Sequence, residues 1–158
     1  MFNFWCKKQA VEFSSKLFDE KSFYSAFLSD LEDCEHEVII ESPFISKKRM
    51  SVLLPFFRRL VNRGITVYVI TKHPSILTQP LASYSEEIIR EFEILGVHVL
   101  AATNHHHRKL AILDRKVLWE GSLNILSQTN SREIMRRIEG EGHATEMFKF
   151  LKLGRFIK

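Results

Sequence analysis

The residues of this chain that are best suited to chemistry lie between His105 and Glu133. Three consecutive histidines precede Lys109 and Asp114, and the sequence Gly-Ser-Leu-Asn follows at 121–124. An imidazole, an ammonium, a hydroxyl and an amide are the groups that cleavage of a phosphodiester without a metal ion requires. The imidazole can attack phosphorus and hold the phosphoryl group covalently. The ammonium and the amide can neutralise charge on the non-bridging oxygens of the transition state.

The spacing of these residues predicts which of them can act together. If residues 107–114 form a strand, its period of two places His107 and Lys109 on one face and Asp114 on the other. Asp114 cannot reach the other two from the same strand. Its expected role is therefore structural, as an acceptor of hydrogen bonds in a turn or across an interface.

A hairpin turn after this strand would return the chain, so that Ser122 and Asn124 also share a face. Gly121 would let the backbone come close to a ligand. Glu133 is expected to hydrogen-bond the far ring nitrogen of His107, which would fix the tautomer and orientation of the imidazole. The leaving oxygen also needs a proton, and a second positioned acid is not evident in the chain.

The elements that must position these residues alternate between strand and helix in the first two thirds of the chain. Helical spacing is found at residues 21–36, 50–64 and 85–96, and Pro55 is expected to begin or kink the second of these helices. Strand-like runs occupy residues 37–42, 65–72 and 97–102. This order predicts an α/β fold with a mixed, largely parallel sheet flanked by helices. Past residue 104 the chain becomes strand-rich, and a helix at 141–153 closes the domain.

Length and composition are those of one globular domain. The chain has 158 residues, of which 45% are hydrophobic and 27% charged, so we expect a single domain over residues 1–158 with a substantial core. The two cysteines, Cys6 and Cys34, are too few for a disulfide framework and suit a reducing compartment. No run reaches the roughly 18 apolar residues of a membrane span. We therefore expect a cytoplasmic protein without integral membrane association.

Charge is unevenly distributed along the chain, although the net charge is only +4. Residues 12–41 contain nine acidic and two basic residues, whereas residues 42–85 contain seven basic residues and no acidic one. Segregation of this kind is typical of proteins that bind a polyanion such as nucleic acid or an anionic lipid surface. A solvated helix face is the alternative interpretation of the basic run.

The motif HxKxxxxD at His107, Lys109 and Asp114, followed by GSxN at 121–124 and then Glu133, resembles the signature of the phospholipase D superfamily. The segments VIIESPFIS and RGITVYVIT resemble the first strands of that family, so the resemblance covers about residues 20–153. It implies a phospholipase D-like catalytic domain. The catalytic residues that it implies, in chain order, are His107, Lys109, Asp114, Ser122, Asn124 and Glu133.

The resemblance also implies how the missing acid is supplied. Full-sized members of the family carry two such motifs whose histidines meet in one site, and this chain carries one copy. A homodimer would bring two His107 side chains together across a two-fold axis, where one attacks and the other protonates the leaving group. The two imidazoles would titrate as a coupled pair. No metal or other cofactor is implied.

Several residues near the motif have competing interpretations. His105 and His106 match no motif position and could bind zinc, line the substrate path or lie in solvent; we expect one of the latter two. Residues that could contact substrate are Ser42, Lys47, Lys48, Arg49, Trp119 and Arg132. For Trp119 and Ser42, packing in the core and a strand-to-helix turn are the alternatives.

The single-motif members that this chain resembles are small bacterial dimeric nucleases. Together with the basic segment, this predicts a metal-independent endonuclease acting on DNA, either single-stranded or flexible duplex, with RNA left open. An enzyme that hydrolyses or transphosphatidylates phospholipids is the first alternative. A nucleic-acid-binding module without catalytic activity is the second.

Overall fold

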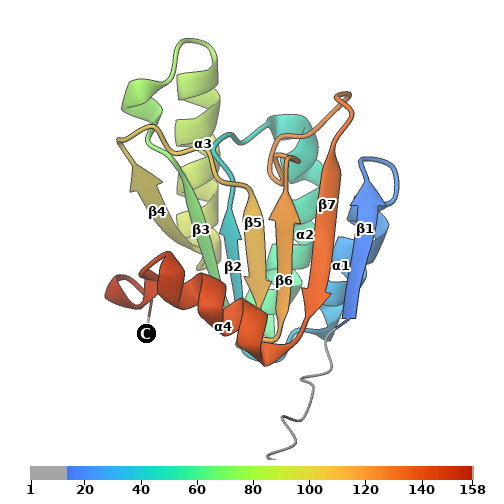
Figure 1. Cartoon of the computed structure of the whole chain (residues 1–158). Coiled ribbons are helices and arrows are strands. Elements are labelled where there is room, and N and C mark those ends of the chain that lie inside the picture. The colour runs from blue at the N-terminus through green and yellow to red at the C-terminus, as the bar shows by residue number, and fades with distance from the viewer. Residues whose placement is uncertain (1–13, 158) are drawn as a thin grey trace, which may run out of the picture.

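One mixed β-sheet organises the part of the chain that the structure describes, residues 14–157 (Figure 1). In this computed structural model its strands follow the order β1-β7-β6-β5-β2-β3-β4. Their bounds are β1 Ser14–Asp19, β2 Glu37–Glu41, β3 Thr66–Lys72, β4 His98–Ala102, β5 Leu110–Leu113, β6 Val117–Gly121 and β7 Ile134–Glu139. The N-terminal segment that contains Cys6 lies outside the described residues.

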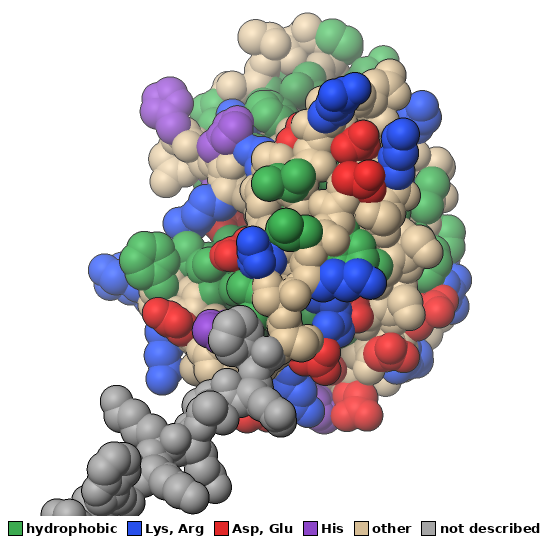
Figure 2. All heavy atoms as spheres, turned by 45° about the vertical axis from the view of Figure 1, so that its right-hand side comes forward, with side chains coloured by type: hydrophobic (Ala, Val, Ile, Leu, Met, Phe, Trp, Pro, Cys, Tyr) green, Lys and Arg blue, Asp and Glu red, His purple; other side chains and the backbone are tan. Residues whose placement is uncertain are grey.

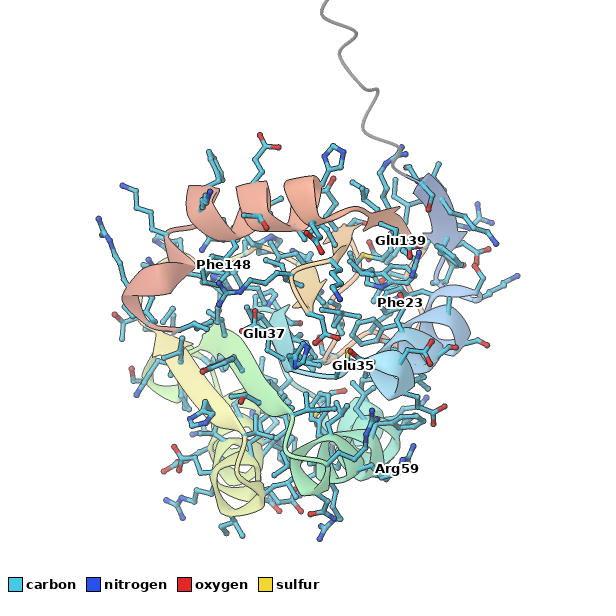
Figure 3. The ribbon with its side chains drawn as sticks, turned by 90° about the horizontal axis from the view of Figure 1, so that it is seen from below. Phe23, Glu35, Glu37, Arg59, Glu139 and Phe148 are labelled. Carbon is cyan, nitrogen blue, oxygen red and sulfur yellow. The ribbon has the colours of Figure 1, made fainter. Side chains whose placement is uncertain are left out.

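Helices cover the two faces of the sheet unequally (Figure 1). One face is packed by α1 (Phe23–Asp33), α2 (Lys47–Asn62) and α3 (Leu81–Leu95), and the other by α4 (Glu141–Phe150) and the short 3-10 turn η2 (Leu153–Arg155). Viewed from below, Phe23 of α1 and Phe148 of α4 lie on opposite sides of the sheet (Figure 3). Because α4 crosses only the lower part of its face in Figure 1, the upper part of that face is left uncovered.

The α/β fold predicted from the sequence is confirmed, and the parallel part of the sheet is confined to β2, β3 and β4. The other pairings are antiparallel, including β2 with β5 and β5 with β6. The reason is the length of the connections. The segment between β5 and β6 is too short for a crossover and permits only a hairpin, whereas a helix links each parallel strand to the next.

Two local features differ from the sequence-based expectation. Strand β1 was not expected, because its side chains are largely exposed and show no strong alternation; it forms by pairing with β7 at the edge of the sheet. Pro55 lies inside α2 rather than at its start. The helix begins earlier, where the Ser46 hydroxyl accepts a hydrogen bond from the Arg49 N–H at 3.3 Å and caps it.

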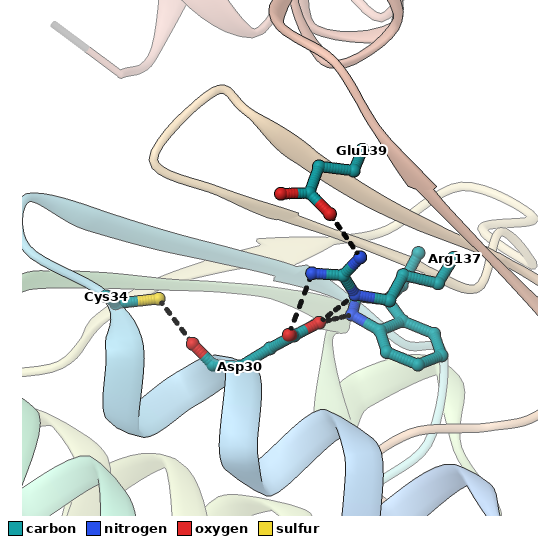
Figure 4. Close-up of polar contacts among 5 residues, drawn as sticks. Asp30, Cys34, Arg137 and Glu139 are labelled. Atoms are coloured by element: carbon teal, nitrogen blue, oxygen red, sulfur yellow. Dashed lines mark hydrogen bonds and ion pairs between the residues drawn. The ribbon is translucent and has the colours of Figure 1, made fainter. Parts of the chain in front are cut away.

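A largely buried carboxylate attaches α1 to the sheet (Figure 4). Asp30 accepts hydrogen bonds from the indole N–H of Trp119 at 2.8 Å and from Arg137 at 2.7 and 3.0 Å. The Trp119 ring is fully buried and packs edge-on against Phe23 and Phe27. The hydrogen bonds of Asp30 and the packing of the aromatic rings around Trp119 therefore stabilise the same part of the core.

The free thiol of Cys34 is buried at the end of α1 and donates to the Asp30 carbonyl at 3.3 Å. Burial raises its pKa to about 12. The thiol is therefore an unreactive core group. Across residues 14–157, no helix is long and apolar enough to cross a membrane.

The turn between β5 and β6 is anchored to the start of β2 by Asp114. Its carboxylate accepts backbone N–H groups of Glu35 and His36 at 2.8 Å and of Glu37 at 2.9 Å. Glu35 and Glu37 are labelled in Figure 3, which shows the molecule of Figure 1 from below. Burial alone would raise the pKa of Asp114, but the three donors hold it below its ordinary value. Asp114 therefore has the structural role expected from the strand period.

An Asp114→Ala substitution should lower the free energy of unfolding by about 3 kcal/mol, because three backbone donors lose a charged acceptor. Since the folded-state pKa is depressed, this contribution is present above pH about 4 and fades as the pH falls further. Chemical denaturation at pH 7 and pH 3 measures both effects. Asp33→Ala, which removes an exposed carboxylate from the end of α1, serves as the control. An equal loss in both variants would contradict this role for Asp114.

Candidate active site

A groove of about 930 Å³ is lined by residues before β5, at the end of β6 and at the start of β7. These ends of the strands lie at the upper edge of the sheet in Figure 1. This edge holds the carboxyl end of β6 and the amino ends of β5 and β7, next to the carboxyl ends of the parallel strands. The catalytic residues predicted from the motif that line the groove are His107, Lys109, Ser122, Asn124 and Glu133. Segments far apart in the sequence therefore converge on one cavity.

His107 and Lys109 lie together as the period of two predicts. The Lys109 Nζ is 2.7 Å from the His107 Nδ1 and 2.7 Å from the His107 carbonyl oxygen. The strand itself begins only at Leu110, so both residues belong to the extended segment that leads into β5. Arg108, between them, binds Glu41 and also lines the groove.

The surroundings of Lys109 disfavour its positive charge. Burial lowers its pKa below the ordinary value, and the nearby Lys72 lowers it further. The carboxylate of Glu133 opposes both effects. An ammonium that is partly desolvated and faces another cation is well placed to bind an anion such as a phosphate.

The Gly-Ser-Leu-Asn segment crosses from β6 to β7. The Ser122 hydroxyl accepts the Ile134 N–H at 3.1 Å, and the Ser122 N–H donates to the Ile134 carbonyl at 3.0 Å. A Cβ at Gly121 would lie 2.2 Å from the same carbonyl oxygen. Glycine is therefore required for the close approach of β7, and Gly121 also lines the groove.

Asn124 contributes an unsatisfied group to the site. Its backbone carbonyl accepts the N–H groups of Ser127 and Gln128 at 3.0 and 2.8 Å, which fixes the turn that follows. Its side-chain Oδ1 is buried, and within residues 14–157 it has no hydrogen-bond partner. An unpaired buried amide oxygen is costly, so a bound ligand or water would relieve it.

Glu133 has a different partner from the one expected. Its Oε1 accepts a hydrogen bond from Ser131 at 2.8 Å, whereas the Nδ1 of His107 is occupied by Lys109. Glu133 still lines the groove and influences the charge of Lys109. Asp114 is the motif residue that lies elsewhere, since β5 separates it from His107.

None of the residues expected to contact substrate from outside the motif lines the groove. Ser42 and Trp119 are fully buried. Lys47 pairs with Glu87 at 2.8 Å, and Arg49 donates to the carbonyl of Gln128 at 2.9 and 3.2 Å. The remaining two, Lys48 on α2 and Arg132 before β7, are exposed.

Contacts between α1 and α2 explain the segregation of acidic and basic residues along the chain. Arg59 of α2 pairs with Glu32 of α1 at 3.2 Å, and Arg63 donates to the backbone carbonyls of Glu32 and Cys34 at 2.8 and 2.6 Å. The acidic and basic segments thus meet where α1 and α2 pack. These contacts lie on the face of the sheet that α4 does not cover.

Other residues take the place of the expected substrate contacts. Arg108, Glu120 and Arg136 line the groove, and Lys72 acts on Lys109. Arg136 and Arg137 are neighbours in β7, and the sequence alone does not show which of them faces the groove. Alternation along β7 separates Arg136 from Arg137, because Arg137 turns inward to bind Asp30.

The other two histidines of the triplet differ from each other. His105 is exposed, whereas His106 is buried with its Nδ1 3.6 Å from the Glu41 carboxylate. Burial, followed by the charge of Arg108, lowers the pKa of His106 to about 4. Within the described part of the chain, no three histidine, cysteine or acidic side chains are grouped as a metal site would need.

A mixed α/β sheet with histidine, lysine and asparagine converging on a groove at one edge is the arrangement of a phospholipase D-like phosphodiesterase domain. The family model described as "Cardiolipin synthase, PLD-like domain" matches residues 27–152. The chain belongs to this family, whose superfamily members are phosphodiesterases. No curated protein sequence matches the chain.

Solved structures share the fold. NucT from Helicobacter pylori has a TM-score of 0.69 at 18% identity, over 89% of this chain and 94% of that one. The phospholipase D family member Nuc from Salmonella typhimurium has a TM-score of 0.71 at 17% identity, over 89% and 93%. A phosphatidylserine synthase from Haemophilus influenzae has a TM-score of 0.66 at 13% identity, over 90% of this chain but 39% of the synthase.

A Lys72→Met substitution should raise the pKa of Lys109 toward its ordinary value, because a like charge is removed from beside it. An NMR titration of the isotope-labelled lysine ammonium groups measures this shift. Lys48→Met, on the exposed side of α2, should leave it unchanged. A Lys109 pKa that is insensitive to Lys72 would show that the two charges are not coupled.

Proposed function

We propose that the protein is a metal-independent endonuclease that hydrolyses DNA through a covalent phosphohistidine at His107. The observation that supports this most is the groove itself. It brings the His107 imidazole into contact with the Lys109 ammonium and places the Asn124 side chain, whose NH2 group can donate hydrogen bonds, beside them. These groups match the nucleophile and the charge stabilisation that phosphoryl transfer needs.

In the first step, a ring nitrogen of His107 attacks phosphorus, a nitrogen–phosphorus bond forms and the bond to the leaving oxygen breaks. A ring nitrogen that accepts a hydrogen bond from Lys109 carries no proton, so its lone pair becomes available for attack once Lys109 moves away. The phosphate draws the Lys109 ammonium to its non-bridging oxygens, and Asn124 donates to them as well. Water then attacks phosphorus, releases the phosphate monoester and restores His107.

The leaving oxygen takes its proton from His107 of a second copy of the chain, which accepts a proton from the attacking water in the second step. The surroundings of the groove support such a contact. Leu17, Ile134 and Phe150 line the groove with 57, 61 and 79% of their surfaces exposed. Figure 2, with the β1 side turned forward, shows hydrophobic side chains exposed between charged ones. These three exposed side chains form an apolar rim around the groove. A two-fold contact between two copies of the chain over this rim would bury them.

A nucleic acid is the substrate that the charge of the groove favours. The groove is lined by three basic side chains, those of Arg108, Lys109 and Arg136. A fourth, Lys72, lies close enough to shift the pKa of Lys109. The positive charge of the groove therefore suits a phosphate backbone. The chain also matches nearly the full length of Nuc and NucT but under half of the synthase. Single-stranded or flexible DNA fits a groove without a recognition helix. The free Cys34 thiol supports a reducing, cytoplasmic setting.

The same exposed apolar rim favours one second candidate, a phosphodiesterase that acts on phospholipids. The rim would then contact acyl chains while the cationic groove holds the headgroup phosphate. The phosphatidylserine synthase among the similar folds belongs with this candidate. The two candidates share the nucleophile and differ in substrate.

The purified protein should cleave single-stranded and supercoiled DNA in excess EDTA, and His107→Ala should lower the rate by at least about 10³-fold because the nucleophile is lost. Gel electrophoresis of the products measures the rates. His105→Ala, which changes the exposed neighbour, is the matched control and should keep its activity. RNA and phospholipid vesicles are tested in parallel.

The outcomes separate the candidates. Cleavage that survives EDTA and is lost only in His107→Ala supports the nuclease. Cleavage that requires added metal contradicts the histidine mechanism. Release of headgroup from vesicles, with DNA left intact, would replace the nuclease by the lipid enzyme.

A further inference from the structure

We propose that Glu41, at the end of β2, is a positioning residue that directs His107 and Lys109 into the groove by binding Arg108. The inference deepens the proposed function at the same groove. It requires only that His107 and Lys109 act there and does not depend on whether the phosphodiester belongs to DNA or lipid. Glu41 itself does not line the groove.

The contact between Glu41 and Arg108 is close and bidentate. The Arg108 guanidinium donates to the two carboxylate oxygens at 2.7, 3.0 and 3.1 Å. The Glu41 side chain is fully buried, while about half of the Arg108 side chain remains exposed. A planar guanidinium held through two nitrogens has a fixed direction, which a single-point contact would not give it.

The segment that carries the nucleophile needs such an anchor because it lies outside the sheet. Strand β5 begins at Leu110, so residues 105–109 precede the region of regular pairing. The Lys109 carbonyl accepts the Gly121 N–H at 3.3 Å, and the His106 N–H donates to the Asn104 carbonyl at 2.7 Å. Within the described chain, the Arg108 side chain is the part of this segment that binds β2 through charged hydrogen bonds.

This anchor fixes the backbone between the two catalytic residues. Arg108 itself lines the groove together with His107 and Lys109. Because the guanidinium of Arg108 is bound to Glu41, the backbone on either side of it is held in place, and His107 and Lys109 are kept at the groove. Loss of the anchor would let the segment rotate and separate the two catalytic groups from the groove.

A contribution to stability alone does not explain why the Glu41 carboxylate is buried in an ion pair with Arg108. Burial raises its pKa, and Arg108 acts in the opposite direction. The neighbouring His106 has a pKa of about 4 and is neutral near pH 7, so it adds no positive charge. A buried ion pair is often no more stable than an apolar pair of similar volume, which favours a geometric role for this one.

The next residue in the chain supports the other half of the site in the same way. The Ser42 hydroxyl accepts the Leu126 N–H at 3.2 Å, two residues after Asn124. The end of β2 thus contacts both segments that form the groove. This adjacency strengthens the assignment of a positioning role to Glu41.

The test compares Glu41→Gln with Asp30→Asn, a matched control. Asp30 is likewise a largely buried carboxylate that two guanidinium nitrogens bind, but its partner Arg137 does not line the groove. On the phosphodiester substrate that the wild-type protein cleaves, Glu41→Gln should lower kcat about 10- to 100-fold with little change in KM. Asp30→Asn should keep the wild-type kcat per folded molecule.

A second measurement is independent of turnover. Hydrogen exchange of the backbone amides in residues 105–109 should accelerate in Glu41→Gln and remain unchanged in Asp30→Asn. This result stands even if the protein shows no phosphodiesterase activity, so failure of the proposed function would not be confused with failure of the positioning role. A Glu41→Met, Arg108→Met double variant removes both charges and guards against misfolding of the single variant.

The double variant should recover stability while its exchange remains altered; its kcat is not compared, because it also removes the charge of Arg108 from the groove. Wild-type kcat and wild-type exchange in folded Glu41→Gln would overturn the proposal. Recovery of wild-type exchange in the double variant would also overturn it, because it would show that the contact between Glu41 and Arg108 does not hold the segment in place.

Discussion

The groove depends on how β2 ends. The groove is formed by two segments, one before β5 and one after β6. Both lie outside the regular pairing of the strands. The adjacent residues Glu41 and Ser42 contact both segments, through Arg108 and through the Leu126 N–H. Because β2 lies between the parallel and the antiparallel parts of the sheet, it is also the point where the two halves of the fold join. Fold and site are therefore specified at the same place.

Charge is organised around this point on two sides of the sheet. On the side of α1 and α2, acidic and basic segments neutralise each other through contacts such as Arg59 with Glu32. On the side of the groove, the basic side chains of Arg108, Lys109, Arg136 and the nearby Lys72 outnumber the carboxylates of Glu133 and Glu120. The surface that would meet a phosphodiester is thus more basic than the modest net charge indicates, and the basic run of α2 does not contribute to it.

Much of the site could be predicted from the sequence, because the period of two along an extended segment is a local property. It placed His107 with Lys109 and assigned Asp114 a structural role, as the structure shows. The substrate contacts could not be predicted, because burial and pairing depend on packing between distant elements. Trp119 is buried by the aromatic side chains of α1, and Arg136 is distinguished from Arg137 only by which one meets Asp30. The pairing of β1 with β7 likewise depends on residues far apart in the chain.

The central claim is that His107 attacks phosphorus, and the most direct test is to trap the covalent intermediate. The protein is mixed with its phosphodiester substrate, quenched in alkali, which preserves phosphohistidine, and digested for mass spectrometry. The account predicts a substrate-derived phosphoryl adduct on His107 that acid removes and that Lys109→Met reduces. Sustained turnover without an adduct under rapid quenching, or an adduct on another residue, would contradict it.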